Sequence, residues 1–134
     1  MPGGANVLTN TATGTLNLSS TIATPLTYYT GTATLNNAGI LNQTASGVHN
    51  IHGSIGFNNT GTLNVDAGTL RIDGAFTQSG SLNVASGASL QKTAGFANSG
   101  FIAGNGTVDV GAATLTNNGI VRPGGVAAII TFHS

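Results

Sequence analysis

A phrase of the form apolar-x-Asn/Gln-x-Gly-x-apolar recurs along this chain every 19 to 25 residues and constrains the fold more than any other feature. Self-similarity at a fixed period is the signature of a solenoid, in which each repeat forms one layer and no layer is stable alone. A first, degenerate copy precedes five clear ones. The glycines that mark the phrase are Gly14, Gly39, Gly61, Gly80, Gly100 and Gly119.

One repeat, residues 57–75, indicates what each layer looks like. Leu63 and Val65 alternate with polar residues, and after a turn Leu70 and Ile72 do the same. Short alternating segments bounded by Gly, Asn and Asp are typical of β-strands. Parallel strands cannot be joined by a hairpin, so the chain must travel around a coil to pair each strand with its equivalent. We therefore predict an all-β, right-handed parallel β-helix (β-solenoid) of about five to six coils of 19–25 residues, with a roughly triangular cross-section.

The spacing of the glycines predicts one β-solenoid domain over residues 1–134. The first coils, residues 1–56, are expected to be irregular, with bulges or loops at 19–30 and 45–53. Residues 57–125 are expected to form regular coils, and residues 126–132 an apolar edge strand. Solenoid ends expose unpaired strand edges. The chain is therefore expected to be a segment of a longer β-helix or to stack end to end on other copies.

Stacking converts equivalent positions into columns along the axis. The first apolar column is expected to contain Leu35, Phe57, Phe76, Phe96 and Leu115. The second is expected to contain Leu16, Leu41, Leu63, Leu82, Ile102 and Val121. A ladder of amides, which can donate to and accept from one another, is expected at Asn37, Asn59, Gln78, Asn98 and Asn117. Outward-facing columns are expected at Asn17, Asn42, Asn64, Asn83, Ala103 and Arg122, and at Arg71, Gln91 and Asp109. The marker glycines are expected either to adopt a positive φ or to allow a tight corner.

Charge is scarce, with three Lys or Arg and three Asp or Glu in 134 residues. A net charge of zero without a basic cluster argues against nucleic acid and anionic membranes as partners, and it favours self-association. The chain has no cysteine, which excludes disulfides and thiolate chemistry. No apolar run is long enough to insert into a membrane. The first residues do not resemble a signal peptide, so a signal for export, if one exists, is expected outside this chain.

Residues 57–70 and 76–90 resemble the repeats of large secreted bacterial surface proteins, namely autotransporter passenger domains and filamentous-haemagglutinin-like adhesins. Residues 118–125 are similar to a Pro-Gly phrase that recurs late in such passengers. The resemblance covers roughly residues 31 to 132. It implies export, an extracellular or bacterial cell-surface location, and a role in adhesion or as a stalk. It provides no catalytic residue.

Catalytic and metal chemistry are disfavoured by the spacing of the polar residues. Glycoside hydrolysis requires two carboxyl groups within about 10 Å, whereas Asp66, Asp73 and Asp109 fall in separate turns or coils. His49 and His52 have no third metal ligand nearby in sequence. We therefore expect no enzyme activity, no cofactor and no metal.

The expected function is that of a non-enzymatic structural or adhesive segment, with end-to-end assembly into filaments as an open alternative. Its partners would be other copies of the chain or a glycan or protein of a cell surface. A second hypothesis is a glycan- or surface-binding module that uses irregular loops carrying Tyr28, Tyr29, His49 and His52. Ice binding by a flat face rich in Thr and Asn is a weaker hypothesis, because the repeated outward column is Asn.

Overall fold

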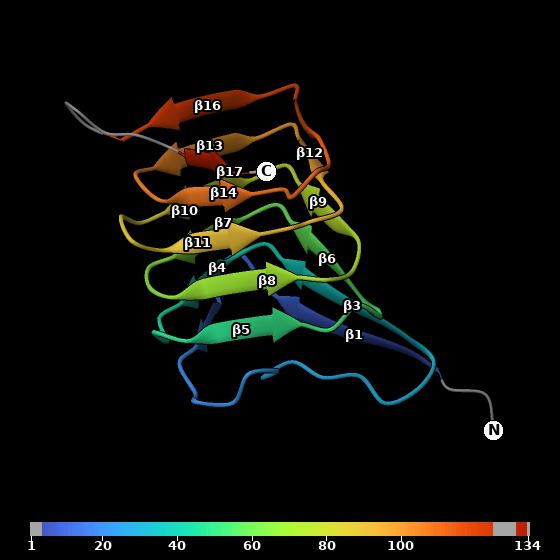
Figure 1. Cartoon of the computed structure of the whole chain (residues 1–134). Helices are drawn as coiled ribbons and strands as arrows, with labels where there is room; N and C mark the ends of the chain where they lie inside the picture. The colour runs from blue at the N-terminus through green and yellow to red at the C-terminus, as the bar shows by residue number, and fades with distance from the viewer. Residues whose placement is uncertain (1–3, 125–130, 134) are drawn as a thin grey trace.

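The computed structural model describes residues 4–124 and 131–133, and it confirms the predicted all-β parallel β-helix. The described residues contain no helix, and their strands form three parallel sheets, here called A, B and C. The chain passes through the sheets in turn and climbs one layer per circuit, so that the three sheets become the three sides of a roughly triangular coil. The circuit is right-handed (Figure 1).

The order of strands within each sheet follows from this path, because each strand pairs with its equivalents in the coils before and after. Sheet A contains β1 (Ala5–Asn10), β3 (Thr32–Asn37), β6 (Ile55–Asn59), β9 (Phe76–Gln78), β12 (Phe96–Asn98) and β15 (Leu115–Asn117). Sheet B contains β2 (Thr15–Leu18), β4 (Ile40–Gln43), β7 (Thr62–Val65), β10 (Ser81–Val84), β13 (Phe101–Gly104) and β16 (Ile120–Pro123). Sheet C contains β5 (Val48–Ile51), β8 (Thr69–Ile72), β11 (Ser89–Gln91), β14 (Thr107–Asp109) and β17 (Thr131–His133).

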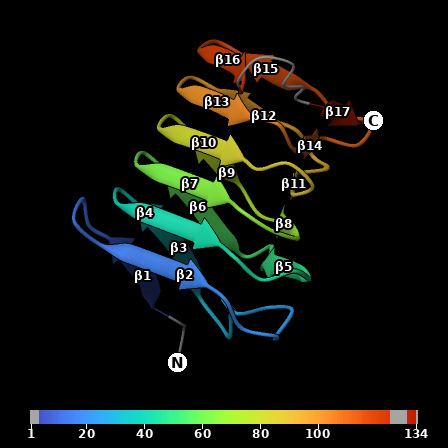
Figure 2. The same ribbon diagram turned by 90° about the vertical axis from the view of Figure 1, so that its left-hand side faces the viewer.

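The strands stack as parallel rungs from the first coil to the last (Figure 2). In sheet A, Leu35 pairs with Phe57 and Phe57 with Phe76. The Phe76 ring lies 5.2 Å from that of Phe57 and 5.1 Å from that of Phe96 between centroids, within the range of favourable aromatic pairs. This apolar column continues to Leu115.

The second apolar column lies on the inner side of sheet B. Its paired residues are Leu16, Leu41, Leu63, Leu82, Ile102 and Val121. The four central members are 0% exposed, so the core is continuous along the axis. Burial of each such side chain stabilises the fold by about 1.5–3 kcal/mol, and no single coil could provide the whole core.

The marker glycines form a column of their own at the corner between sheets A and B. A Cβ atom added to Gly61, Gly80, Gly100 or Gly119 would overlap the carbonyl oxygen of the marker glycine one coil earlier. That oxygen is already engaged, since Gly61 O accepts a 2.8 Å hydrogen bond from the Ser81 amide. Of the two reasons expected for these glycines, the tight corner is therefore the one observed. The positive-φ glycines lie elsewhere, at Gly31, Gly68, Gly87, Gly95, Gly104 and Gly111.

The irregular part of the first coils is smaller than expected. Residues 19–31 form no named strand and contact sheet C through an isolated bridge from Leu26 to Ile51. Residues 45–53, expected as a bulge or loop, instead contain β5, so that expectation is wrong. The polar His49 occupies an inward position of β5, so the sequence of this strand does not show the usual alternation of apolar and polar residues. Of the predicted edge strand 126–132, residues 126–130 lie outside the described residues, whereas 131 and 132 belong to β17.

Gly80→Ala should lower the free energy of unfolding by about 2 kcal/mol or more, because the new methyl group would push two stacked corners apart. Gly56→Ala is the matched control: it lies in β6, and its nearest neighbour to an added Cβ is 3.9 Å away. This control should be neutral or stabilising by about 0.5 kcal/mol. Urea denaturation would compare the two variants, provided that the dependence of the unfolding free energy on urea concentration is the same for both. Equal midpoint urea concentrations would contradict the role of the glycine column.

Candidate functional site

A file of buried amides runs inside the corner between sheets A and B. Asn37 Nδ2 donates to Asn59 Oδ1 at 2.8 Å, and Asn59 Nδ2 donates to Gln78 Oε1 at 2.8 Å. The same nitrogens also donate to Thr62 O and Ser81 O of the following coil. All three amides are 0% exposed, where an unpaired donor or acceptor would cost about 1–3 kcal/mol. The file therefore holds successive coils in one register.

The file is interrupted after Gln78. Gln78 Nε2 donates to Gly80 O at 2.8 Å and to Phe101 O at 3.3 Å rather than to Asn98. Asn98 Nδ2 then begins a second segment by donating to Asn117 Oδ1 at 2.8 Å. The glutamine side chain is one methylene longer than asparagine, and its amide donates to these carbonyls. Each buried amide keeps a partner in both segments.

The file also extends further toward the first coil than sequence reasoning placed it. Asn10 Nδ2 donates to Asn37 Oδ1 at 2.7 Å, and Leu8 pairs with Leu35 at the start of the first apolar column. In the first repeat, three residues lie between Asn10 and Gly14, instead of the usual one. The inserted residues hid this copy of the phrase, although its Leu-x-Asn spacing is normal.

A second amide ladder lies on the outer face of sheet B. Asn42 Nδ2 donates to Asn17 Oδ1, Asn64 to Asn42, and Asn83 to Asn64, each at 2.9 Å. In this outer ladder every donor points toward the first coil, whereas in the inner file every donor points toward the last. The column continues through Ala103 to Arg122.

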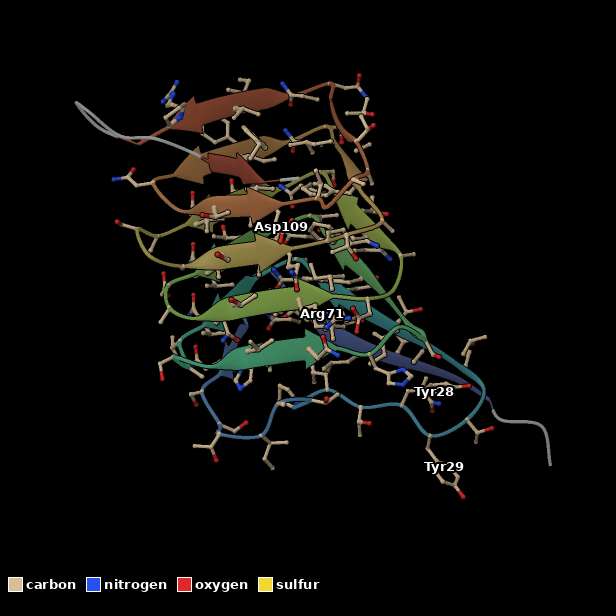
Figure 3. All side chains as sticks on the ribbon, viewed as in Figure 1. Tyr28, Tyr29, Arg71 and Asp109 are labelled. Atoms are coloured by element: carbon tan, nitrogen blue, oxygen red, sulfur yellow. The ribbon has the colours of Figure 1, made fainter. Side chains whose placement is uncertain are left out.

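The charged side chains on the outer face of sheet C have hydrogen-bond partners. Arg71 on β8 and Asp109 on β14 face outward from this sheet (Figure 3), and Gln91 on the intervening strand β11 pairs with both. Arg71 Nε donates to Asp73 Oδ1 at 2.7 Å, and Asn50 Nδ2 donates to Asp73 Oδ2 at 2.8 Å. Both oxygens of Asp73 therefore accept hydrogen bonds from side chains of the same face.

Asp109 is bound in the same way. Its Oδ2 accepts from Gln91 Nε2 at 3.0 Å, and its Oδ1 accepts from the Gly111 amide at 2.9 Å. Asp66 is exposed in the turn after β7.

Among residues 4–124 and 131–133, no three His, Cys, Asp or Glu side chains gather where they could hold a metal ion. The described residues also include no helix that is long and apolar enough to cross a membrane.

His49 belongs to the core and not to a binding loop. Its side chain is 2% exposed, with Nδ1 2.6 Å from Gln43 Oε1 and Nε2 2.8 Å from Ser20 O. One coil later the equivalents of His49 and Gln43 are Leu70 and Val65. The polar pair of His49 and Gln43 thus replaces an apolar pair at the coil where His49 contacts the backbone of residues 19–31.

The other residues of the predicted binding loop divide into two groups. The rings of Tyr28 and His52 stack at 5.5 Å, and Tyr28 Oη donates to Gly31 O at 2.7 Å. Tyr29 is 96% exposed and projects away from the stack beneath the first coil (Figure 3). Only Tyr29 is therefore free to present an aromatic surface to a ligand.

Lys92 is a buried cation that sequence reasoning missed. It follows β11 at an inward position, one residue beyond the pair of Gln91 and Arg71, and its side chain is 5% exposed. The equivalent residues in the adjacent coils, Ile72 and Val110, are apolar and buried. Alternation from Leu90 through Gln91 would have indicated an inward Lys92.

Two hollows lie at the two ends of the stack of coils. One groove of about 570 Å³ lies between β1, β3 and the loop, and its lining includes Leu8, Leu26 and Leu35. Another of about 450 Å³ lies against the last coil, and its lining includes Leu115, Val121 and Phe132. A third, of about 500 Å³, lies beside His49. The two end grooves are where the apolar columns reach the surface.

Comparison with known proteins returned no similarity: no protein-family model, no curated protein and no solved structure matches this chain. The functional argument therefore depends on the sequence and on the geometry of the described residues.

His49→Leu should lower the free energy of unfolding by about 2 kcal/mol, because it removes the buried polar contacts of the imidazole ring with Gln43 Oε1 and Ser20 O. The double variant His49→Leu/Gln43→Val carries the residues of the next coil at both positions and should return to within about 1 kcal/mol of the parent. Thermal and urea denaturation of the set would measure the coupling. Additive losses would show that the two side chains do not act as a pair.

Proposed function

We propose that this chain is a non-enzymatic structural segment of a bacterial surface or extracellular protein, a rod that can assemble end to end. The support for a structural role is that the polar groups are used to hold the coils together. The inner file joins coils inside the core, and the outer ladder joins them across sheet B. Such uniform use of side chains is typical of a scaffold.

The observation that carries the proposal against an enzyme is the engagement of the carboxylates. Asp73 accepts from Arg71 and Asn50, and Asp109 accepts from Gln91 and Gly111. Glycoside hydrolysis requires two carboxyl groups aimed at one substrate bond. Asp66 is in a turn of its own. These contacts favour structural roles for the acidic side chains.

The proposed location follows from the resemblance of residues 57–70 and 76–90 to repeats of secreted bacterial adhesins. A surface built from Thr, Asn, Ser and Gly, with 4% charged residues, suits an extracellular rod. Flat polar faces along the rod would space or display neighbouring parts of a larger surface protein.

A glycan-binding module is the second candidate, and the exposure of Tyr29 is the observation that favours it. An exposed aromatic ring can stack on a sugar face. Tyr28 and His52 already pack on each other, and His49 is buried, so a site at this loop would depend on Tyr29.

Carbohydrate arrays and polysaccharide digestion separate these functions. We expect the parent chain, Tyr28→Ala and Tyr29→Ala to give the same array profile, and we expect no release of reducing ends from any polysaccharide. Circular dichroism would verify that the variants remain folded. Loss of an array signal in Tyr29→Ala would favour the binding module. Turnover by the parent that Asp109→Asn abolishes would overturn the structural proposal.

A further inference from the structure

The inner amide file has a direction, and it gives the two ends of the rod different hydrogen-bonding characters. Each donor points toward the last coil, from Asn10 to Asn37, Asn37 to Asn59 and Asn98 to Asn117. The file therefore begins with the acceptor Oδ1 of Asn10. It ends with Nδ2 of Asn117, which reaches only Gly119 O in its own turn among the described residues. One end presents an acceptor and the other a donor.

The apolar columns reach the surface at the same two ends. At the first coil, Val7 is 59% and Leu8 47% exposed on β1, the edge strand of sheet A. At the last coil, Leu115 and Val121 are only partly buried and line the end groove. Exposed apolar edges of this kind are unfavourable in water, and pairing with another strand removes them.

Continuing the observed register beyond the last coil brings matching residues together. A further coil of the same kind as the first would place Leu8 on Leu115, Asn10 on Asn117 and Leu16 on Val121, as the columns run within the molecule. Each of these pairs joins either two apolar side chains or two amides. At the outer face, Asn17 would lie opposite Arg122, so no two charges of one sign meet.

We infer that the partner of this rod is a second copy of the same chain, stacked head to tail in register, with β1 on β15 and β2 on β16. The inference rests on the proposed function and specifies the contact through which end-to-end assembly occurs. Sheets A and B continue from one copy into the next, and the donor of Asn117 meets the acceptor of Asn10. A slip by one residue would turn every inward side chain outward, so the register is specified strongly.

Head-to-head and tail-to-tail contacts lack this complementarity. Two first coils would bring the Oδ1 atoms of two Asn10 side chains together, and two last coils would bring together donors from two Asn117 side chains. Reversing one copy also makes the strand pairing antiparallel, which breaks the columns that parallel stacking creates. The structure thus favours one polarity.

Disulfide trapping tests the register directly, because the chain has no cysteine of its own. Asn17→Cys and Arg122→Cys alter exposed side chains on the outer face of sheet B. Neighbouring strands lie about 4.8 Å apart, which suits the Cα separation of a disulfide. Under mild oxidation, a mixture of Asn17→Cys and Arg122→Cys should form the mixed disulfide-linked dimer, because stacked thiols react at a high effective concentration. The control is a mixture of Thr62→Cys, on β7, and Arg122→Cys. The first mixture should react about tenfold faster than the control.

Each variant alone gives the polarity control. Dimers of Asn17→Cys alone would require head-to-head contact, and dimers of Arg122→Cys alone would require tail-to-tail contact. Either result, or equal trapping with Thr62→Cys, overturns the inference. Circular dichroism and thermal melting of the reduced variants verify their folds. Sedimentation velocity of the parent chain over a concentration series measures assembly without introduced cysteines. We expect the sedimentation coefficient to increase with protein concentration. A coefficient that stays at the monomer value overturns the inference.

These outcomes are distinguishable from failure of the proposed function. A rod that remains monomeric can still be a non-enzymatic scaffold, which the array and digestion experiments measure separately. Polysaccharide turnover would overturn the scaffold and leave the trapping result unaffected.

Discussion

Exact repetition of register from coil to coil is the constraint on which the rest of this structure depends. A buried amide such as Asn59 can accept from the coil before and donate to the coil after only if all three are aligned. The same alignment brings each marker glycine against the carbonyl of the previous one, which leaves no room for a side chain. Amides and glycines therefore enforce one register by opposite means, the first by attraction and the second by exclusion.

Much of this architecture could be predicted because a solenoid converts sequence spacing into spatial contact with few other choices. The apolar columns and the positions of Asn37 and Asn59 followed from the period alone. The exceptions are local. Two additional residues before Gly14 displaced Leu8 and Asn10 from the expected phrase. His49 concealed a strand because a core position that carries a hydrogen-bonded polar residue resembles a loop in sequence.

The function could be predicted less well, for a related physical reason. In a repetitive scaffold, a side chain that departs from the repeat can either bind a ligand or fill an irregularity in the packing of the coils. The spacing of residues in the sequence does not distinguish these two roles. Tyr28 and Tyr29 are adjacent in sequence, yet one ring packs on His52 and the other projects into solvent. The path of residues 19–31 determines which is which, and this segment forms no named strand where the next coil has β5.

The opposite directions of the two amide ladders have a consequence for how long such a rod can become. Aligned peptide dipoles in an α-helix accumulate into a partial charge at each end, whereas sheets have small net dipoles. Here the dipoles of the inner file and of the ladder through Asn42 and Asn64 oppose each other along the axis. The two sets of amide dipoles therefore offset each other where both are present, and a longer rod would not accumulate the end charges of a long α-helix.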